Sequence, residues 1–123
     1  MENRNLEIEA NEGANCLFCK IGSGAINSTF VHEDENCFVI RDITPQAPSH
    51  LLVIPKKHYQ NIAVLDDKLL IGELLQMATR VAAQENLANG FRLVINTGSD
   101  GGQSVGHLHI HVLGGRSMHW PPG

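Results

Sequence analysis

The chain has 123 residues and a mass of 13.4 kDa, which suits a single domain with its own core. Its residues are 42% hydrophobic and 18% charged, which excludes a disordered or fibrous protein, and its apolar runs, such as Leu51 to Ile54, are far shorter than the ~20 residues of a membrane-spanning helix. Nine Lys and Arg against 13 Asp and Glu leave a net charge of -4, which argues against a nucleic-acid-binding domain that works by neutralising phosphates.

The N-terminal segment, residues 1–15, is polar and acidic. It lacks the basic and apolar regions of a secretory signal and the Arg-rich composition of a transit peptide. The chain has three cysteines, an odd number that favours reduced thiols over a disulfide framework. We therefore expect a flexible N-terminal arm over residues 1–15, one domain over residues 16–123, and a cytoplasmic location.

The first half of the domain predicts one short helix and three strands. The helix covers residues 16–21 and is ended by a Gly-Ser-Gly turn. The strands are predicted at residues 29–32, 37–42 and 51–55, and polar or proline-rich connections separate them.

The second half predicts one long helix and two strands. Asp66 is a favoured N-cap and Gly90 a natural stop. Between them apolar residues recur mostly at intervals of three and four, at Leu70, Leu74, Met77, Val81 and Leu87. The strands are predicted at residues 91–96 and 107–113, with a glycine-rich loop over residues 97–104 between them. Five strands with short connections and one long helix predict an α+β fold with a mainly antiparallel sheet.

Three of the seven histidines fall within five residues, at His107, His109 and His111. In a strand, alternate side chains share a face, so the three imidazoles point one way, about 7 Å apart, while the residues between them face the core. An ordinary solvated strand draws on Thr, Lys and Glu, and this one uses none. The pattern therefore indicates a functional site rather than an ordinary solvent-exposed strand face.

Two kinds of chemistry suit three imidazoles. They can hold a catalytic zinc with water in the open position, or one can attack phosphorus while its neighbours manage protons and charge. The loop before the strand, with Gly101, Gly102, Gln103 and Ser104, lets backbone N–H groups approach an anion. A glycine loop facing a row of imidazoles favours the phosphoryl site.

The segment His107–Leu113, with three histidines alternating with hydrophobic residues, resembles the signature of the histidine triad (HIT) superfamily. The likeness continues through four further segments, Asp42–His50, Leu52–His58, Gly98–Val105 and the tail Leu113–Gly123. Together they resemble the nucleotide-binding Hint branch, over about residues 16–123.

The resemblance implies a homodimer with a HIT-like fold: a five-stranded, mainly antiparallel sheet, one long helix and a short N-terminal helix. It also implies a purine nucleoside phosphoramidase, which hydrolyses the P–N bond of adenosine or guanosine 5'-monophosphoramidates through a covalent nucleotidyl-histidine intermediate. No metal is required for that reaction, and neither a nucleic acid nor a membrane is an expected partner. Two alternatives stay open: a nucleotide-binding regulatory protein with incidental hydrolysis, and a zinc hydrolase that uses the triad as ligands.

The resemblance also implies catalytic roles. It makes His109 the nucleophile, gives His111 a hydrogen bond to the phosphate, and turns Ser104 toward the leaving amine. His50 and His107 orient the nucleophile or relay protons to it.

The same resemblance implies the binding residues. Asp42 holds the ribose hydroxyls, while Ile43 and Phe18 line the base pocket. Contacts with the sugar and phosphate are expected from Asn96, Gly102 and Gln103. Trp120, in the C-terminal tail, shapes the amine side of the pocket. From the sequence alone, Asp42 also fits a turn-capping role at a strand end, and Trp120 fits packing at a subunit edge.

Cys16 and Cys19 have the spacing of a metal knuckle or a redox pair. A redox pair should open a helix after a strand in a βαβ unit, which is not predicted here. A structural zinc needs two further ligands, for which His58 and His107 are the candidates. Zinc and a pair of reduced thiols both remain open, with zinc favoured because some histidine triad proteins carry such a site.

Overall fold

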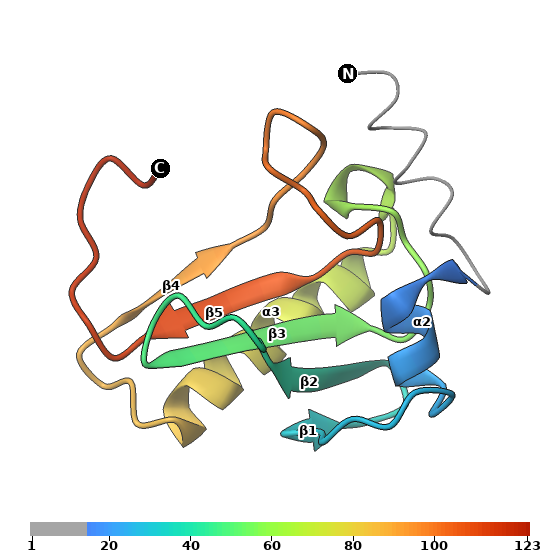
Figure 1. The fold of residues 1–123 in the computed structure, drawn as a ribbon, viewed down its shortest axis with the longest axis horizontal. Helices are drawn as coiled ribbons and strands as arrows, with labels where there is room; N and C mark the ends of the chain where they lie inside the picture. The colour runs from blue at the N-terminus through green and yellow to red at the C-terminus, as the bar shows by residue number, and fades with distance from the viewer. Residues whose placement is uncertain (1–14) are drawn as a thin grey trace.

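A computed structural model describes residues 15–123, which form one antiparallel sheet with helices on its two faces (Figure 1). The elements in chain order are α2 (Leu17–Gly22), β1 (His32–Glu33), β2 (Cys37–Arg41), β3 (Ser49–Pro55), the 3-10 turn η2 (Ile62–Val64), α3 (Lys68–Gln84), β4 (Phe91–Val94) and β5 (Ile110–Gly114). The strand order is β1-β2-β3-β5-β4, and every neighbouring pair is antiparallel. The predicted α+β architecture is confirmed.

Alternating side chains of β2 and β3 build two cores on opposite faces of the sheet. On the face covered by α3, Val39 and Val53 pack with Leu74 and Val81 of the helix. The opposite face packs against α2, and its core contains Phe18, Ile21, Phe38, Ile40, Leu52 and Ile54. Because both faces are covered, β2 and β3 read as continuous apolar runs rather than as alternating ones.

The long helix begins later and ends earlier than predicted. Asp67, not Asp66, is the N-cap, and its carboxylate accepts a hydrogen bond from the Leu70 N–H at 3.1 Å. The helix stops at Gln84, well before Gly90, because Asn86 takes a left-handed conformation with φ of 60°. Leu87 therefore lies outside the helix, although it still packs against the core.

The outer strands are shorter than predicted. The first covers only His32–Glu33, in place of residues 29–32, and the fourth ends at Val94 rather than at residue 96. The last strand begins at Ile110, three residues after the predicted start. Pairing with β3 cannot run further because the backbone N–H of Leu108 donates to the carbonyl of Tyr59, at 2.7 Å.

Among residues 15–123, no helix is both long and apolar enough to cross a bilayer. The predicted N-terminal arm lies almost wholly outside the described residues.

Candidate functional site

The loop between β4 and β5 is shaped by one buried side chain, Gln103. Its amide nitrogen donates to the carbonyls of Gln60 (2.6 Å) and Val105 (3.0 Å), and its amide oxygen accepts from the N–H of Gly98 (3.0 Å). Gln103 is only 1% exposed. Its side chain therefore holds the loop together and does not face the open side, where a bound phosphate was expected to meet it.

The outer part of the same loop stays open to solvent. The amide of Asn96 donates to the carbonyl of Gly101 at 2.7 Å, which ties the two ends of the turn. Gly102 has φ of 76°, a conformation that favours glycine, and Ser104 is exposed. The loop thus presents backbone and a hydroxyl group just before the three histidines, which we call the histidine row (His107, His109 and His111).

His107 is fully buried and is held at both ring nitrogens. Its Nε2 lies 2.7 Å from the carbonyl of Pro55, which can only accept, so Nε2 carries the proton. Nδ1 is then a lone pair, and it faces the sulfurs of Cys16 (3.2 Å) and Cys19 (3.5 Å). Burial lowers the pKa of His107 to about 4, helped by two neighbouring imidazoles, so the ring is neutral at pH 7.

His109 is held by the backbone of the same row. Its Nδ1 lies 2.9 Å from the carbonyl of His107, so Nδ1 carries the proton and Nε2 has the free lone pair. Burial lowers its pKa, which keeps that lone pair available near neutral pH. The ring of Phe18 packs against it edge to face, with centroids 5.3 Å apart. His109 is therefore a neutral imidazole with a fixed tautomer.

A short chain of hydrogen bonds, from Gln46 through His50, fixes the position of the proton on His111. The N–H of Gln46 donates to Nδ1 of His50 at 3.0 Å, so the His50 proton sits on Nε2 and is donated to Nδ1 of His111, 2.8 Å away. The remaining proton of His111 is then on Nε2, where it can be donated to an anion. Burial, together with the nearby imidazoles, lowers the pKa of His111 to about 4.

Asp42 lies at the far end of this chain. One carboxylate oxygen accepts from the N–H of Thr44 at 2.8 Å, so Asp42 does cap a turn. The other lies 3.5 Å from Nε2 of His50 and is placed at the edge of the histidine group. Because each carboxylate oxygen can accept more than one hydrogen bond, the turn does not exhaust its capacity for a sugar diol.

The sequence-predicted site residues fall into two groups. Asp42, His50 and the histidine row form a continuous series of contacts that ends at Phe18. Ile43 and Trp120, in contrast, are 98% and 82% exposed, so in the single chain they form no closed pocket wall. A hollow of about 500 Å³ lies between residues 86–92 and 115–118, and none of the predicted site residues lines it.

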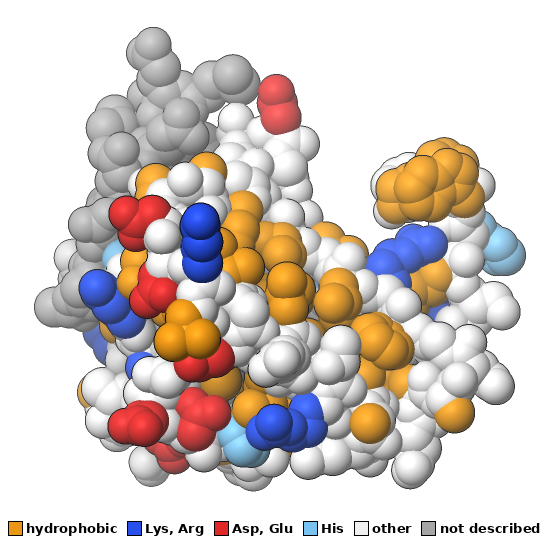
Figure 2. Space-filling view, turned by 180° about the vertical axis from the view of Figure 1, so that it is seen from behind, with side chains coloured by type: hydrophobic (Ala, Val, Ile, Leu, Met, Phe, Trp, Pro, Cys, Tyr) orange, Lys and Arg blue, Asp and Glu red, His pale blue; other side chains and the backbone are white. Residues whose placement is uncertain are grey.

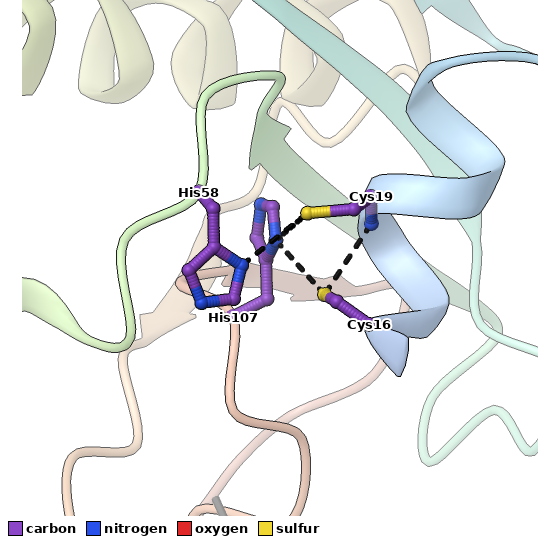
Figure 3. A group of neighbouring side chains, drawn as sticks. All are labelled: Cys16, Cys19, His58 and His107. Atoms are coloured by element: carbon purple, nitrogen blue, oxygen red, sulfur yellow. Dashed lines mark hydrogen bonds between the residues drawn. The ribbon is translucent and has the colours of Figure 1, made fainter. Parts of the chain in front are cut away.

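Two cysteines and two histidines converge beside the row, and we call Cys16, Cys19, His58 and His107 the cysteine cluster (Figure 3). Their ligand atoms all lie within 4.8 Å of one another. Nδ1 of His58 is 3.3 Å from Sγ of Cys19, and Sγ of Cys16 accepts the N–H of Cys19 at 3.4 Å. The predicted set of four metal-ligating residues is thus brought together.

The cluster has the dimensions of a tetrahedral zinc site. Bonds of about 2.3 Å to sulfur and about 2.0 Å to nitrogen put tetrahedral ligand atoms about 3.5 Å apart, and the nearest sulfur and nitrogen atoms here are 3.2 to 3.5 Å apart. Nε2 of His58 is buried and has no hydrogen-bond partner among the described residues. Burying this nitrogen without a partner costs free energy. One weak contact between Nδ1 and a thiol does not offset that cost, whereas a bond from Nδ1 to a metal does. The residues therefore fit zinc.

Comparisons with known proteins identify the family of the chain. The HIT domain family matches residues 23–118. The chain belongs to the HIT domain family. An uncharacterized HIT-like protein of Synechococcus elongatus is 51% identical to it over 109 residues, which cover 87% of this chain and 96% of the relative.

Solved HIT structures share the fold. A HIT family hydrolase from Legionella pneumophila is 53% identical, with a TM-score of 0.86 over 89% of this chain and all of that one. A hypothetical histidine triad nucleotide-binding protein from Sulfolobus tokodaii is 35% identical, with a TM-score of 0.75 over 86% of this chain and 72% of that one. A zinc-bound histidine triad family protein from Mycobacterium smegmatis is also 35% identical, with a TM-score of 0.74 over 82% of this chain and 75% of that one.

Sequence reasoning missed the groups that fix the protons of the site. The carbonyls of Pro55 and His107 and the N–H of Gln46 set the tautomers of three imidazoles. All three are backbone groups, which every residue carries, so no pattern of side chains marks them. Gln46 and Pro55 do lie in segments that resemble the Hint branch, which is the only sequence signal that pointed to them.

Proposed function

We propose that this HIT domain hydrolyses the P–N bond of purine nucleoside 5'-monophosphoramidates, with His109 as the nucleophile. The observation that carries the proposal is the state of His109, a buried neutral imidazole whose Nδ1 proton is donated to the His107 carbonyl, leaving Nε2 free to attack. The relative named as a HIT family hydrolase and the one named as nucleotide-binding support the same class of reaction.

The reaction takes two displacements at phosphorus. In the first, Nε2 of His109 bonds to phosphorus as the P–N bond to the amine breaks, and the amine nitrogen takes up a proton as it leaves. In the second, water attacks phosphorus, gives up a proton and releases the imidazole, which yields the nucleoside monophosphate. The Nε2 proton of His111 and the N–H groups of the glycine loop offset the charge on the phosphoryl oxygens, and Ser104 faces the amine.

The nucleotide is proposed to lie across the row with its ribose at Asp42, an acceptor for both hydroxyls. Ile43 and Phe18 flank the base, and Asn96 with Gly102 meets the sugar and phosphate. Gln103 contributes by holding the loop, since its side chain is used inside the loop. His50 donates to Nδ1 of His111 and so keeps the His111 proton on Nε2.

We propose that the enzyme is a homodimer in which the partner's Trp120 completes the pocket. β4 is an edge strand, Phe91 on it is 41% exposed, and Leu75 on α3 is 39% exposed. A band of hydrophobic side chains is visible in the view from behind the molecule (Figure 2). An interface over this side removes both apolar groups from water and covers the strand edge. Sedimentation should give twice the mass of the chain.

A structural zinc in the cysteine cluster is proposed alongside. Cys16, Cys19, His58 and His107 would supply four ligands to a zinc ion, which would cross-link α2, the segment after β3 and the histidine row and leave no open position for chemistry. The alternative of a zinc hydrolase with the triad as ligands does not fit these contacts. The rings of His107, His109 and His111 turn toward three different partners.

The test is incubation with an adenosine 5'-phosphoramidate, with AMP and free amine as products. His109→Ala should lower the rate by at least about 10³-fold, the scale on which loss of a nucleophile acts. His32→Ala, at the partly exposed histidine of β1, is the control and should keep the wild-type rate. Turnover retained in His109→Ala refutes the mechanism, whereas tight AMP binding without turnover in the wild type favours a nucleotide-binding regulator.

A further inference from the structure

The segment that carries the nucleophile lies outside the sheet. β5 begins at Ile110, and its last ladder pair with β3 is Val53 with Ile110. His107 and His109 come before that pair, so no strand ladder holds the backbone that connects them. The carbonyl of His107 nevertheless has to stay in place, because it receives the Nδ1 proton of His109.

Side-chain and loop contacts replace the missing ladder. On one side, Nε2 of His107 donates to the carbonyl of Pro55, and the next residue, Leu108, donates its N–H to Tyr59. On the other side, Nδ1 of His107 faces the sulfurs of Cys16 and Cys19. The ring is thus clamped between the end of β3 and the first turn of α2.

The remaining member of the cysteine cluster, His58, and the neighbouring ring of Phe18 tighten the same clamp. The ring of His58 packs edge to face on that of His107, with centroids 4.9 Å apart. Phe18 lies between the two cysteines in the sequence and packs edge to face on the rings of His107 and His109, with ring centroids 5.9 and 5.3 Å apart. A shift of α2 therefore moves one wall of the nucleophile and the anchor of its hydrogen-bond acceptor together.

We propose that Cys16, Cys19 and His58 are positioning residues for the nucleophile: by holding the His107 ring together with a bound zinc ion, they fix the His107 carbonyl and so the tautomer of His109. The proposal rests on the proposed function only for its kinetic consequence. When the clamp is released, the Nδ1 proton of His109 loses a fixed acceptor, both tautomers become populated, and a fraction of the enzyme has no lone pair at Nε2.

The first readout is the His109 tautomer, which does not depend on any substrate. Nitrogen NMR of the imidazole rings separates a protonated Nδ1 from a protonated Nε2, with the His109 signals assigned by their loss in His109→Ala. Wild-type protein loaded with zinc should show only the Nδ1–H form. Cys19→Ser and His58→Ala should each show a mixture of the two forms, and Cys37→Ser, which removes a buried thiol from the other core, should keep the wild-type signals.

The second readout is the kinetic split with an adenosine 5'-phosphoramidate. Both cluster variants should lower kcat by about 10- to 100-fold, as loss of groups behind a reacting residue does, and leave KM within about twofold. Cys37→Ser should change neither value by more than about twofold. Where a cluster variant does not fold, wild-type protein treated with a chelator and then resupplied with zinc gives the same comparison, with kcat and the single tautomer lost and regained together.

The proposal is overturned if the cluster variants, or the chelated wild type, keep the single Nδ1–H tautomer. It is also overturned if a tautomer mixture forms while kcat stays at the wild-type value. If the wild type hydrolyses no phosphoramidate, the proposed function fails, and the NMR result alone decides whether the clamp positions His109.

Discussion

The two ends of the histidine row lie in opposite surroundings. At one end His107 is fully buried, and its two ring nitrogens face the sulfur of Cys16 and the carbonyl of Pro55. At the other end His111 is partly exposed, and its Nδ1 accepts the hydrogen bond from His50, which leaves its proton on Nε2. Two histidines four residues apart in one row thus differ in the partner at each ring nitrogen.

Breaking the buried end should have the largest effect on stability. Cys16→Ser removes a fully buried sulfur that faces His107, and in zinc-loaded protein it also removes a metal ligand. We expect a loss of about 3 kcal/mol in the free energy of unfolding, the scale for breaking a buried polar or metal cluster. Denaturant unfolding measures it, and metal analysis should find zinc in the wild type and little in the variant.

Cys37→Ser is the matched control for this loss, because its thiol is also buried but faces the core under α3. An equal loss of stability in both variants, with equal zinc content, contradicts a special role for the cluster.

At the open end a change should affect binding rather than stability. Asp42→Asn removes the charge while keeping the acceptor oxygen of the Thr44 turn. Since a carboxylate can accept from both ribose hydroxyls and a carboxamide oxygen is weaker, KM should rise about tenfold, equal to about 1.4 kcal/mol, with kcat within about threefold. Steady-state kinetics with an adenosine phosphoramidate and with its 2'-deoxy analogue measures the effect. If Asp42 holds the diol, the two substrates should differ less in the variant than in the wild type.

The smallest expected effect is on the acid stability of the open end. The folded-state pKa of His111 is lowered to about 4 from an ordinary value of 6.5, so the unfolded chain binds its proton first as the pH falls. Stability from His111 is complete above pH 6.5 and is lost as the pH drops toward 4.

In His111→Gln, which cannot take up that proton, the fall in unfolding free energy between pH 7 and pH 5 should be smaller than in the wild type. The difference should be under about 1 kcal/mol, because solvent screens the partly exposed ring. Urea titrations at the two pH values measure this difference. If the unfolding free energy falls by the same amount in both proteins, His111 is not the source of the pH dependence.

The same contrast explains what the sequence could predict. The alternation of His107, His109 and His111 with apolar residues predicted one face for the imidazoles and one for the core, and the buried Leu108, Ile110 and Val112 confirm it. The spacing of Cys16 and Cys19 likewise predicted a set of four metal-ligating residues that the fold brings together. Both patterns rest on side chains, whose chemistry is visible in the sequence.

What could not be predicted depends on backbone groups. The late start of β5 follows from the Leu108 N–H, which finds its acceptor at Tyr59 rather than in β3. The side chain of Gln103 turned inward because carbonyls at Gln60 and Val105 lie within its reach. Every residue offers such donors and acceptors, so only the folded chain shows which of them meet.

We propose that His109 is the nucleophile, oriented by its hydrogen bond to the His107 carbonyl. The most direct measurement is mass spectrometry of peptides from a reaction with an adenosine phosphoramidate, quenched within the first turnovers. We expect an AMP group bonded to His109 in the wild type and none in His109→Ala. An adduct on His111 or on another residue, or full turnover with no adduct at all, would contradict it.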